Sequence, residues 1–248
     1  MLTWSLLGLG VIALSLIVYL LSLALRRVLP TWVFDAGVVV GALATVGVRV
    51  AHAGEPVWAA PAALLVLVIW FAATRKELGL PRAARLRVAP GDRLPDVTLA
   101  STGGTSVRSG ELRGPALVVL YRGWWCPYCV TQLGELEREH DALRAAGLSV
   151  YAISVDRPDE QRALEQRLRG RVSFLSDEKG ALLDALGVRH VDGVPWYDRL
   201  LFGARRQDIA LPATLLLDGA GVVRFARRAR RIDDRPSVAE LLAAARPA

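Results

Sequence analysis

Cysteine and lysine are both scarce in this 248-residue sequence. The two cysteines are Cys126 and Cys129, and the two lysines are Lys76 and Lys179. A framework of several disulfides and a zinc site built from four Cys and His side chains are therefore excluded within one chain. The net charge of +7 comes from scattered arginines rather than from a basic block, so we expect no nucleic-acid partner.

Charge is nearly absent from the first 74 residues. They hold five charged side chains, whereas the following 174 residues hold fifty. Hydrophobic residues make up 53% of the chain, which excludes a disordered or fibrous protein. This division predicts two differently built parts: a transmembrane anchor over residues 1–74 and a folded domain over residues 91–248, joined by a basic juxtamembrane linker over residues 75–90.

Three apolar stretches in the first part are candidates for membrane spans. Residues 3–25 are almost entirely apolar and, at about 1.5 Å per residue, cover a hydrocarbon core of roughly 30 Å. No basic segment precedes them, which favours a retained helix over a cleaved signal peptide. Residues 32–51 carry Asp35 and Arg49 near their ends, where both side chains can reach the interface. Residues 56–74 are uncharged and contain interfacial aromatic residues.

Basic residues set the expected orientation of these spans. Arg26 and Arg27 lie between the first two stretches, and Arg75 and Lys76 follow the third. If all three stretches insert, both groups lie on one side, and the positive-inside rule places the folded domain in the cytoplasm. We therefore expect a multi-pass protein of the plasma membrane. If the middle stretch does not insert, the two basic groups separate and this orientation is lost.

From residue 91 onward, helix and strand patterns alternate. Patterns typical of buried strands occur at residues 117–121, 148–155 and 172–175, and helical patterns occur at residues 127–146, 158–168 and 178–186. This order predicts parallel strands with right-handed crossovers. A short turn between residues 211–218 and 222–226 predicts an antiparallel hairpin. Ser237, with Glu240 three residues on, predicts the start of a last helix.

Residues 121–129, with the sequence YRGWWCPYC, concentrate the chemistry. A strand delivers the chain to Cys126, and Pro127 favours the first turn of a helix. Unpaired backbone N–H groups and the helix dipole would stabilise a thiolate on Cys126. Cys129, three residues on, can close a disulfide with it. A C-x-x-C pair at a strand-to-helix junction indicates redox chemistry, and buried structural cysteines or half of a metal site are the alternatives.

The residues around the cysteines are candidates for supporting roles. Arg122 would either add positive potential near the sulfur or face solvent at the end of the strand. Trp124 and Trp125 would shield the disulfide or form a docking surface, and we expect one of them to lie in the core. Pro127 and Tyr128 fill the two positions between the cysteines.

These motifs resemble those of the thioredoxin-fold redoxins, and most closely those of the AhpC/TSA peroxiredoxin-like family. Residues 91–99 resemble the opening of that family, residues 121–129 its active-site segment, and residues 154–156 and 175–177 its middle strands. The resemblance implies an α/β thioredoxin-like fold, with a central mixed sheet flanked by helices, preceded here by about three transmembrane helices. It also implies a thiol-based redox activity that requires no metal or organic cofactor.

Two departures from the peroxiredoxin pattern favour thiol–disulfide exchange over peroxide reduction. Val119 and Gly123 stand where that pattern has Pro and Thr, so the hydroxyl that helps to orient a peroxide is missing. Pro212 stands where such enzymes carry an arginine. By similarity to thioredoxins, Pro212 would be a cis-proline beside the disulfide that leaves a backbone edge free for a substrate chain.

The resulting hypothesis is a membrane-anchored thiol–disulfide oxidoreductase. Cys126 would attack a disulfide of a protein or a small molecule, and Cys129 would resolve the mixed disulfide, with a thioredoxin- or glutathione-type electron donor. One alternative is an antioxidant thiol peroxidase acting on hydroperoxides, in which Cys126 is oxidised to a sulfenate and Cys129 condenses onto it. Another is a Cu(I) chaperone at the membrane, with His190 as a third ligand. The long segment 191–207 would either shape partner selection or be an inert insertion.

Overall fold

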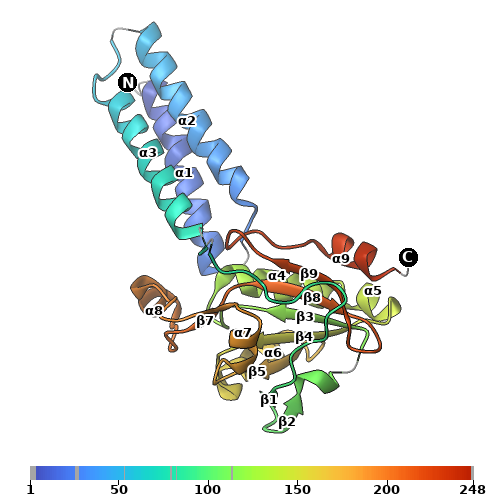
Figure 1. Ribbon diagram of the computed structural model, residues 1–248. Helices are drawn as coiled ribbons and strands as arrows, with labels where there is room; N and C mark the ends of the chain where they lie inside the picture. The colour runs from blue at the N-terminus through green and yellow to red at the C-terminus, as the bar shows by residue number, and fades with distance from the viewer. Residues whose placement is uncertain are drawn as a thin grey trace. The chain divides into compact units, whose positions relative to one another are not determined.

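The computed structural model describes residues 4–25, 28–52, 54–78, 80–81, 83–112 and 114–246. Arg26 and Arg27, on which the predicted orientation depends, lie outside the described residues, as do the side chains of Arg75 and Lys76. The chain divides into two compact units, Met1–Gly79 and Leu80–Ala248 (Figure 1). Each unit has its own core and is described separately.

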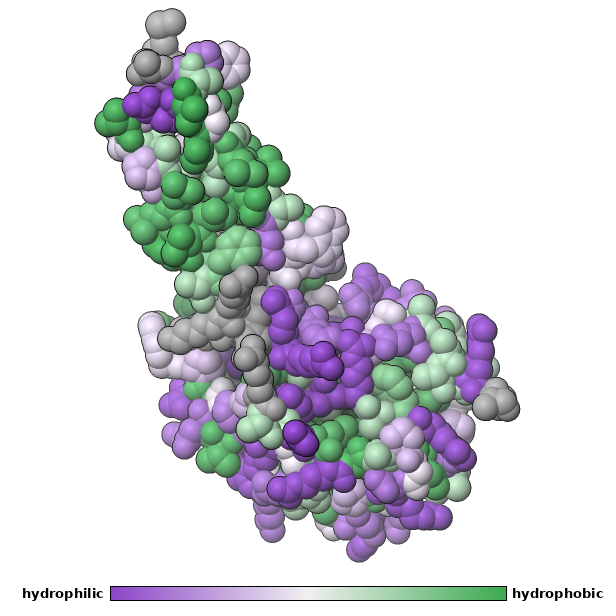
Figure 2. Space-filling model, turned by 45° about the horizontal axis from the view of Figure 1, so that its top comes forward, coloured by the Kyte–Doolittle hydropathy of each residue, from purple (hydrophilic) through white to green (hydrophobic). Residues whose placement is uncertain are grey.

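Three helices form the first unit: α1 (Trp4–Ala24), α2 (Thr31–Ala51) and α3 (Ala59–Leu78). Each helix coincides with one of the apolar stretches. α1 and α2 are long and apolar enough to cross a membrane, whereas the apolar part of α3, Ala59–Thr74, is shorter. The expectation of about three spans is therefore supported for α1 and α2. The apolar part of α3 is shorter because the last turn of this helix, after Thr74, is charged. Figure 2 shows hydrophobic residues gathered over these helices.

The first unit is closely packed. A Cβ atom on Gly8 of α1 would lie 2.7 Å from the carbonyl oxygen of Gly41 in α2, so the two backbones touch, as small residues allow in membrane helix pairs. Tyr19 and Trp70 meet edge to face with ring centroids 5.1 Å apart. The Trp70 indole N–H donates to Asp35 at 2.9 Å, which gives this carboxylate a partner within the unit.

A seven-stranded mixed sheet forms the centre of the second unit. Its strands are β1 (Thr98–Ser101), β2 (Ser106–Arg108), β3 (Ala116–Leu120), β4 (Ser149–Ser154), β5 (Ser173–Ser176), β8 (Ala213–Leu217) and β9 (Val223–Arg228), in the spatial order β2-β1-β5-β4-β3-β8-β9. β3, β4 and β5 are parallel, as predicted. β8 and β9 form the predicted antiparallel hairpin. The sequence patterns did not predict β1 and β2, which are short and partly exposed.

Helices and a small second sheet complete this unit. They are η1 (Ser109–Glu111), α4 (Pro127–Arg138), α5 (His140–Ala145), α6 (Pro158–Arg167), α7 (Ala181–Ala185), α8 (Trp196–Phe202), α9 (Val238–Ala245), β6 (Arg189–His190) and β7 (Ile209–Ala210). The single helix predicted over residues 127–146 is two helices, because Glu139 leaves helical geometry with φ −92° and ψ 13°. Ser237 accepts a hydrogen bond from the Glu240 N–H, the cap predicted for α9.

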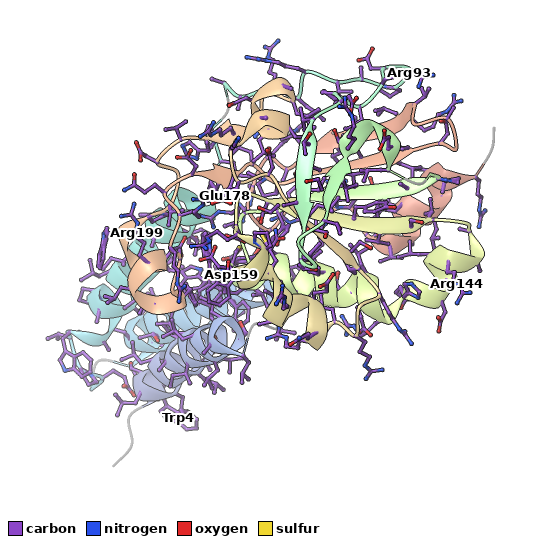
Figure 3. The ribbon with its side chains drawn as sticks, turned by 90° about the horizontal axis from the view of Figure 1, so that it is seen from below. Trp4, Arg93, Arg144, Asp159, Glu178 and Arg199 are labelled. Carbon is purple, nitrogen blue, oxygen red and sulfur yellow. The ribbon has the colours of Figure 1, made fainter. Side chains whose placement is uncertain are left out.

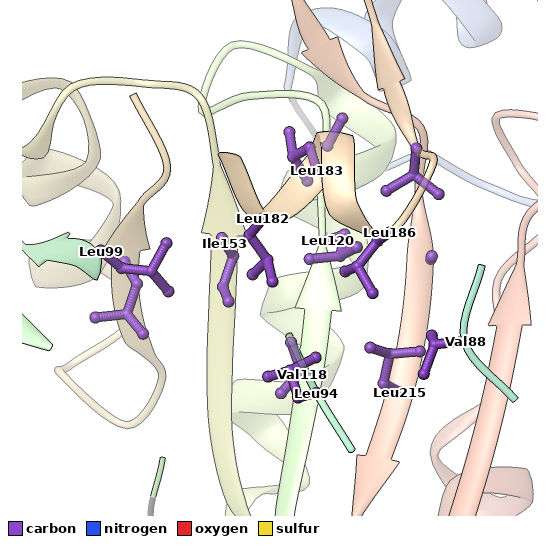
Figure 4. Close-up of a cluster of buried hydrophobic side chains, with 14 of the residues drawn as sticks. Val88, Leu94, Leu99, Val118, Leu120, Ile153, Leu182, Leu183, Leu186 and Leu215 are labelled. Carbon is purple, nitrogen blue, oxygen red and sulfur yellow. The ribbon is translucent and has the colours of Figure 1, made fainter. Parts of the chain in front are cut away.

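The sheet is covered on both faces. All five residues of β3 are buried, as expected for a central strand between two layers. Val118 and Leu120 pack in one cluster with Leu182 of α7 and with Leu186, the residue that follows α7 (Figure 4). The alternate residues of β3 point to the other face. Leu80 already packs against this cluster, so the second unit begins almost directly after α3. The strand that leads to the cysteines is firmly held.

Candidate active site

β3 delivers the chain to the two cysteines. Its pairing with β4 continues one residue further, where the Tyr121 N–H donates to the Ile153 carbonyl at 3.0 Å. Cys126 is then the N-cap residue of α4, Pro127 is its first residue, and Cys129 lies in the first turn. Both cysteines are free thiols and fully buried. The strand-to-helix junction expected from the sequence is present at this point.

Two guanidinium groups reach the sulfur atoms. Arg122 Nη1 lies 3.9 Å from Cys126 Sγ, and Arg235 Nη2 lies 3.7 Å from Cys129 Sγ. The backbone N–H of Arg122 also donates to Cys129 Sγ at 3.4 Å. Arg122 is 6% exposed, so it faces the thiols rather than solvent. Sequence reasoning missed Arg235, because it is one of many scattered arginines and lies 106 residues after Cys129.

The two thiols hydrogen-bond each other and share one proton when the pair is singly ionised. Burial works to raise the pKa of Cys129, but the hydrogen bond from Cys126, the charge of Arg235 and the N–H of Arg122 lower it to about 6. The pKa of Cys126 is raised, first by burial and then by Cys129. The Arg122 guanidinium and a backbone N–H at the helix start lower it less. The pKa of Cys126 is thus raised by its surroundings, whereas the helix start led us to expect a lowered one.

Trp125 is the core member of the tryptophan pair. Its side chain is 1% exposed, and the Arg122 guanidinium lies 5.0 Å from its ring centroid, within the range of a cation–π contact. The indole also fills the space beside Gly123, where a Cβ atom would lie 2.3 Å from Trp125 Nε1. A threonine at this position would require Trp125 to move, which explains the missing hydroxyl. Trp124 and Tyr128 are half-buried.

The middle-strand motif holds the loop that precedes the cysteines. Asp156 Oδ2 accepts from the Trp124 N–H at 2.7 Å and from Ser154 Oγ at 3.0 Å. The Asp156 carbonyl accepts from Ser176 Oγ at 2.6 Å. Asp156 is 1% exposed, and burial raises the pKa of its carboxyl to about 7 against the effect of these donors. The residues that carried the family resemblance thus fix the active-site loop.

The segment 191–207 supplies an acidic residue to the site. It contains α8, from which Asp198 Oδ2 accepts a hydrogen bond from Arg122 Nη2 at 3.1 Å. The two side chains are 8% and 7% exposed, so the ion pair is buried and orients the guanidinium. No motif in the sequence marks Asp198, because the pairing depends on how the segment folds back over the site.

His190 does not complete a metal site with the cysteines. It lies in β6, where burial and the charge of Arg122 lower the pKa of its imidazole. Among the described residues, no group of three or more His, Cys, Asp or Glu side chains is placed to hold a metal ion. The structure therefore does not support His190 as the third Cu(I) ligand of the copper-chaperone alternative.

Pro212 is not a cis-proline, which corrects the thioredoxin-like expectation. In the part of the chain that the structure describes, the cis bond is the one before Pro115. The Pro212 carbonyl accepts from the Ala229 N–H at 2.8 Å, and the Leu211 N–H donates to the Val188 carbonyl at 2.7 Å. The chain around Pro212 is thus held by neighbouring strands, and its carbonyl is already paired rather than free for a substrate.

Comparisons with known proteins identify relatives of this unit. A family model described as "AhpC/TSA family" matches residues 90–226. The chain is 29% identical over 105 residues to "Peroxiredoxin bcp1" of Schizosaccharomyces pombe, which covers 42% of this chain and 54% of that protein. It is 29% identical over 99 residues to "Peroxiredoxin Bcp" of Escherichia coli, which covers 40% of this chain and 64% of that protein. The chain thus spans little more than half the length of the yeast protein.

Solved structures show the same fold. Peroxidoxin BcpB from Mycobacterium tuberculosis matches with a TM-score of 0.53 at 20% identity, covering 64% of this chain and 97% of its own. Peroxiredoxin 5 from Alvinella pompejana matches with a TM-score of 0.52 at 16% identity and the same two coverages. The thioredoxin-like fold with a central mixed sheet flanked by helices is confirmed.

Proposed function

The chain belongs to the AhpC/TSA family, and from this membership we propose that it is a membrane-anchored, antioxidant thiol peroxidase. Cys126 is the attacking thiol and Cys129 resolves the oxidised product. One observation carries the proposal: two buried thiols lie within one turn of each other at the start of α4, and each has a guanidinium group beside it. Positive charge at this point stabilises a thiolate and the oxygen charge that develops as a peroxide bond breaks.

The first step transfers the terminal oxygen of a hydroperoxide to Cys126. The thiolate of Cys129 takes the S–H proton of Cys126, whose sulfur attacks the terminal oxygen of ROOH while the O–O bond breaks. The proton passes from Cys129 to the leaving alkoxide, which leaves as ROH, and Cys126 becomes a sulfenic acid. The thiolate of Cys129 then attacks this sulfur, and hydroxide leaves as the disulfide forms. In this order Cys129, which is ionised above its pKa of about 6, acts first as the base and then as the nucleophile.

A two-electron reductant must return the disulfide to the dithiol. We propose a thioredoxin- or glutathione-type donor, whose thiolate attacks one sulfur and whose second thiol, or a second thiol molecule, completes the exchange. These steps use only thiols and a hydroperoxide.

Thiol–disulfide exchange is the second candidate. The Cys-Pro-Tyr-Cys spacing at a helix start and the absence of a hydroxyl at Gly123 favour it. The sequence ranked it first partly because of Pro212. That argument is lost because the bond before Pro212 is trans, and because Arg235 supplies a guanidinium from another part of the chain. The peroxidase therefore takes first place.

The purified full chain, held in nanodiscs, distinguishes the two activities. With a thioredoxin system as donor, we expect it to consume hydrogen peroxide or cumene hydroperoxide faster than it reduces insulin disulfides. Cys126→Ser should abolish peroxide consumption. Cys129→Ser should slow the first step, because it removes the proposed base, and should stop at a sulfenate on Cys126, detected by dimedone labelling and mass spectrometry. If the chain reduces insulin disulfides faster than it consumes hydroperoxides, thiol–disulfide exchange becomes the first candidate and the peroxidase the second.

We also propose that the first unit lies in the plasma membrane, with the redox unit in the cytoplasm. α1 and α2 are long enough and apolar enough to cross. Large side chains on the outer faces of the three helices support a lipid environment, since Leu14, Leu43 and Val68 are all more than 60% exposed in the isolated chain. The side follows from the arginines of the first 76 residues if α3 crosses as well.

A further inference from the structure

α8 carries an exposed apolar surface on the redox unit. Trp196, Leu200 and Leu201 are 73%, 73% and 68% exposed. Trp196 and Leu200 lie one turn apart and so share a face of the helix. Asp198, between them in sequence, points to the other side, where it meets Arg122. α8 therefore has an inner face that contacts the active-site arginine and an outer face on which large apolar side chains meet solvent.

The segment around α8 is anchored at its ends. Arg189 pairs with Asp208 at 2.7 Å. Arg206 donates to the carbonyls of Val155 and Glu178 at 3.1 and 2.9 Å. Both ends of the segment that carries α8 are therefore attached to the redox unit, and the outer face of α8 is exposed in this arrangement. Arg199, which marks α8 in Figure 3, is also exposed and adds positive charge beside the apolar side chains.

We propose that α8 docks on an anionic bilayer surface, with Trp196, Leu200 and Leu201 among the acyl chains, and that hydroperoxides of membrane lipids are the substrates of the thiol site. The proposal rests on the proposed peroxidase function and names its substrate class. The chemistry of the step is unchanged: R is the lipid chain, the lipid hydroperoxide is reduced to the lipid alcohol, and the two cysteines are oxidised to the disulfide.

A bilayer fits this surface better than a protein partner does. Trp and Leu on one face with arginine beside them is the composition of helices that lie in the membrane interface. Arg199 is exposed and complements anionic headgroups, whereas Arg205, although 74% exposed, lies 3.9 Å from the Glu160 carboxylate. The first unit, proposed above to lie in a membrane, belongs to the same chain, so the redox unit is tethered to any membrane that the first unit occupies.

Docking through α8 would bring the substrate to thiols that solvent does not reach. Cys126 and Cys129 are fully buried, and the contacts run from Asp198 of α8 to Arg122 and from Arg122 to Cys126. Arg122 would therefore lie between the Cys126 sulfur and a hydroperoxide group on an acyl chain beside α8. The charge of Arg122 would act on this hydroperoxide group as it approaches the sulfur. Water-soluble peroxides do not follow this route, so only small ones can reach the buried thiols.

The test uses the full chain in nanodiscs of phosphatidylcholine with and without phosphatidylglycerol, loaded with phosphatidylcholine hydroperoxide. Leu200→Glu with Leu201→Glu should lower kcat/KM for the lipid hydroperoxide by at least about tenfold, since both leucines lose apolar contact with lipid. Turnover of hydrogen peroxide should stay within about twofold of wild type. Ala142→Glu with Ala239→Glu adds the same charge at exposed helical positions outside α8 and should change neither rate.

A second readout measures docking without turnover. Lipids with brominated acyl chains should quench the fluorescence of Trp196, seen as the difference between wild type and Trp196→Phe, and quenching should increase with phosphatidylglycerol. Absence of this quenching, or equal losses in the α8 variant and its control, would overturn the proposal. So would an α8 variant that is slowed only in its reduction by thioredoxin, because α8 would then be a protein-docking surface. A wild-type chain inactive on hydrogen peroxide would instead count against the peroxidase function.

Discussion

At the scale of single residues, the reactivity of the site depends on where one proton lies. The pKa of Cys129 is lowered to about 6, while that of Cys126 is raised. The helix start alone does not make Cys126 acidic, because burial opposes ionisation of both sulfurs. Arg122, four residues before Cys126, and Arg235, from a distant part of the chain, oppose this effect of burial, and they outweigh it only at Cys129.

Removal of one of these arginines should shift the titration of the thiols. Arg235→Gln takes away a positive charge 3.7 Å from Cys129 Sγ, so we expect the pKa of Cys129 to rise from about 6. The thiolate is present above this pKa and lost below it. The rate of peroxide reduction should therefore fall most at and below pH 6, approaching about tenfold for each unit of pKa shift. The measurement is the pH dependence of thiolate absorbance and of single-turnover rate.

Arg235→Lys is the matched control, because it keeps the charge and should keep most of the wild-type titration. An Arg235→Gln variant whose thiolate titrates as in wild type would show that Arg235 does not set the acidity of the pair.

The residues of the site divide by how they are recognised. Cys126, Cys129 and Pro127 are adjacent in sequence and form a local pattern whose meaning does not depend on the rest of the fold. Asp198 and Arg235 reach the site only through tertiary folding, so no local pattern marks them. Gly123 is intermediate: its departure from the family pattern is visible in the sequence, but its cause, the buried ring of Trp125, is visible only in the structure.

At the scale of elements, α8 has the greatest functional consequence. It is a short helix in a segment without periodic apolar residues, and one buried ion pair, Arg122–Asp198, joins it to the active site. The long buried strands and amphipathic helices were predicted because their patterns repeat over many residues. α8, β6 and β7 were not, because two to seven residues are too few to show a period. The break at Glu139 was missed because apolar spacing continues through it.

Removal of the α8 carboxylate should loosen this helix. Asp198→Asn leaves the Arg122 guanidinium buried without its counter-charge, a change that costs about 3–5 kcal/mol for buried pairs. We expect a lower free energy of unfolding in urea, and faster amide hydrogen exchange in α8 than in β3. Asp141→Asn, at a side chain that is 85% exposed, is the control and should leave both unchanged. Equal exchange rates for α8 in wild type and Asp198→Asn would contradict the attachment described here.

At the scale of the whole molecule, the chain joins an apolar three-helix unit to a peroxiredoxin-like unit. The parallel strands and the hairpin were predicted from the alternating strand and helix patterns, and the thioredoxin-like fold was implied by the family resemblance. Pro212 was mistaken for a cis-proline because its place before a late strand is similar in thioredoxins. In the structure the Leu211 N–H donates to the Val188 carbonyl, and the Pro212 carbonyl accepts from the Ala229 N–H. These tertiary contacts around Pro212 cannot be recognised in the sequence.

The proposed orientation predicts which side of a membrane exposes the redox unit. This unit is rich in arginine, so trypsin should digest it in sealed vesicles whose cytoplasmic face is outward. Vesicles of the opposite orientation should protect it until detergent is added. Digestion in the opposite vesicles alone would place the redox unit outside the cytoplasm, as expected if only α1 and α2 cross.

The central claim is that a hydroperoxide converts the buried dithiol of Cys126 and Cys129 into a disulfide through a sulfenic acid on Cys126. The most direct measurement is rapid-quench mass spectrometry of the full chain after addition of an equimolar amount of hydroperoxide. The account predicts a transient gain of one oxygen on Cys126, then a disulfide between the two cysteines, formed much faster than free cysteine reacts. Two thiols that remain open to alkylation, or oxygen gained first on Cys129, would contradict it.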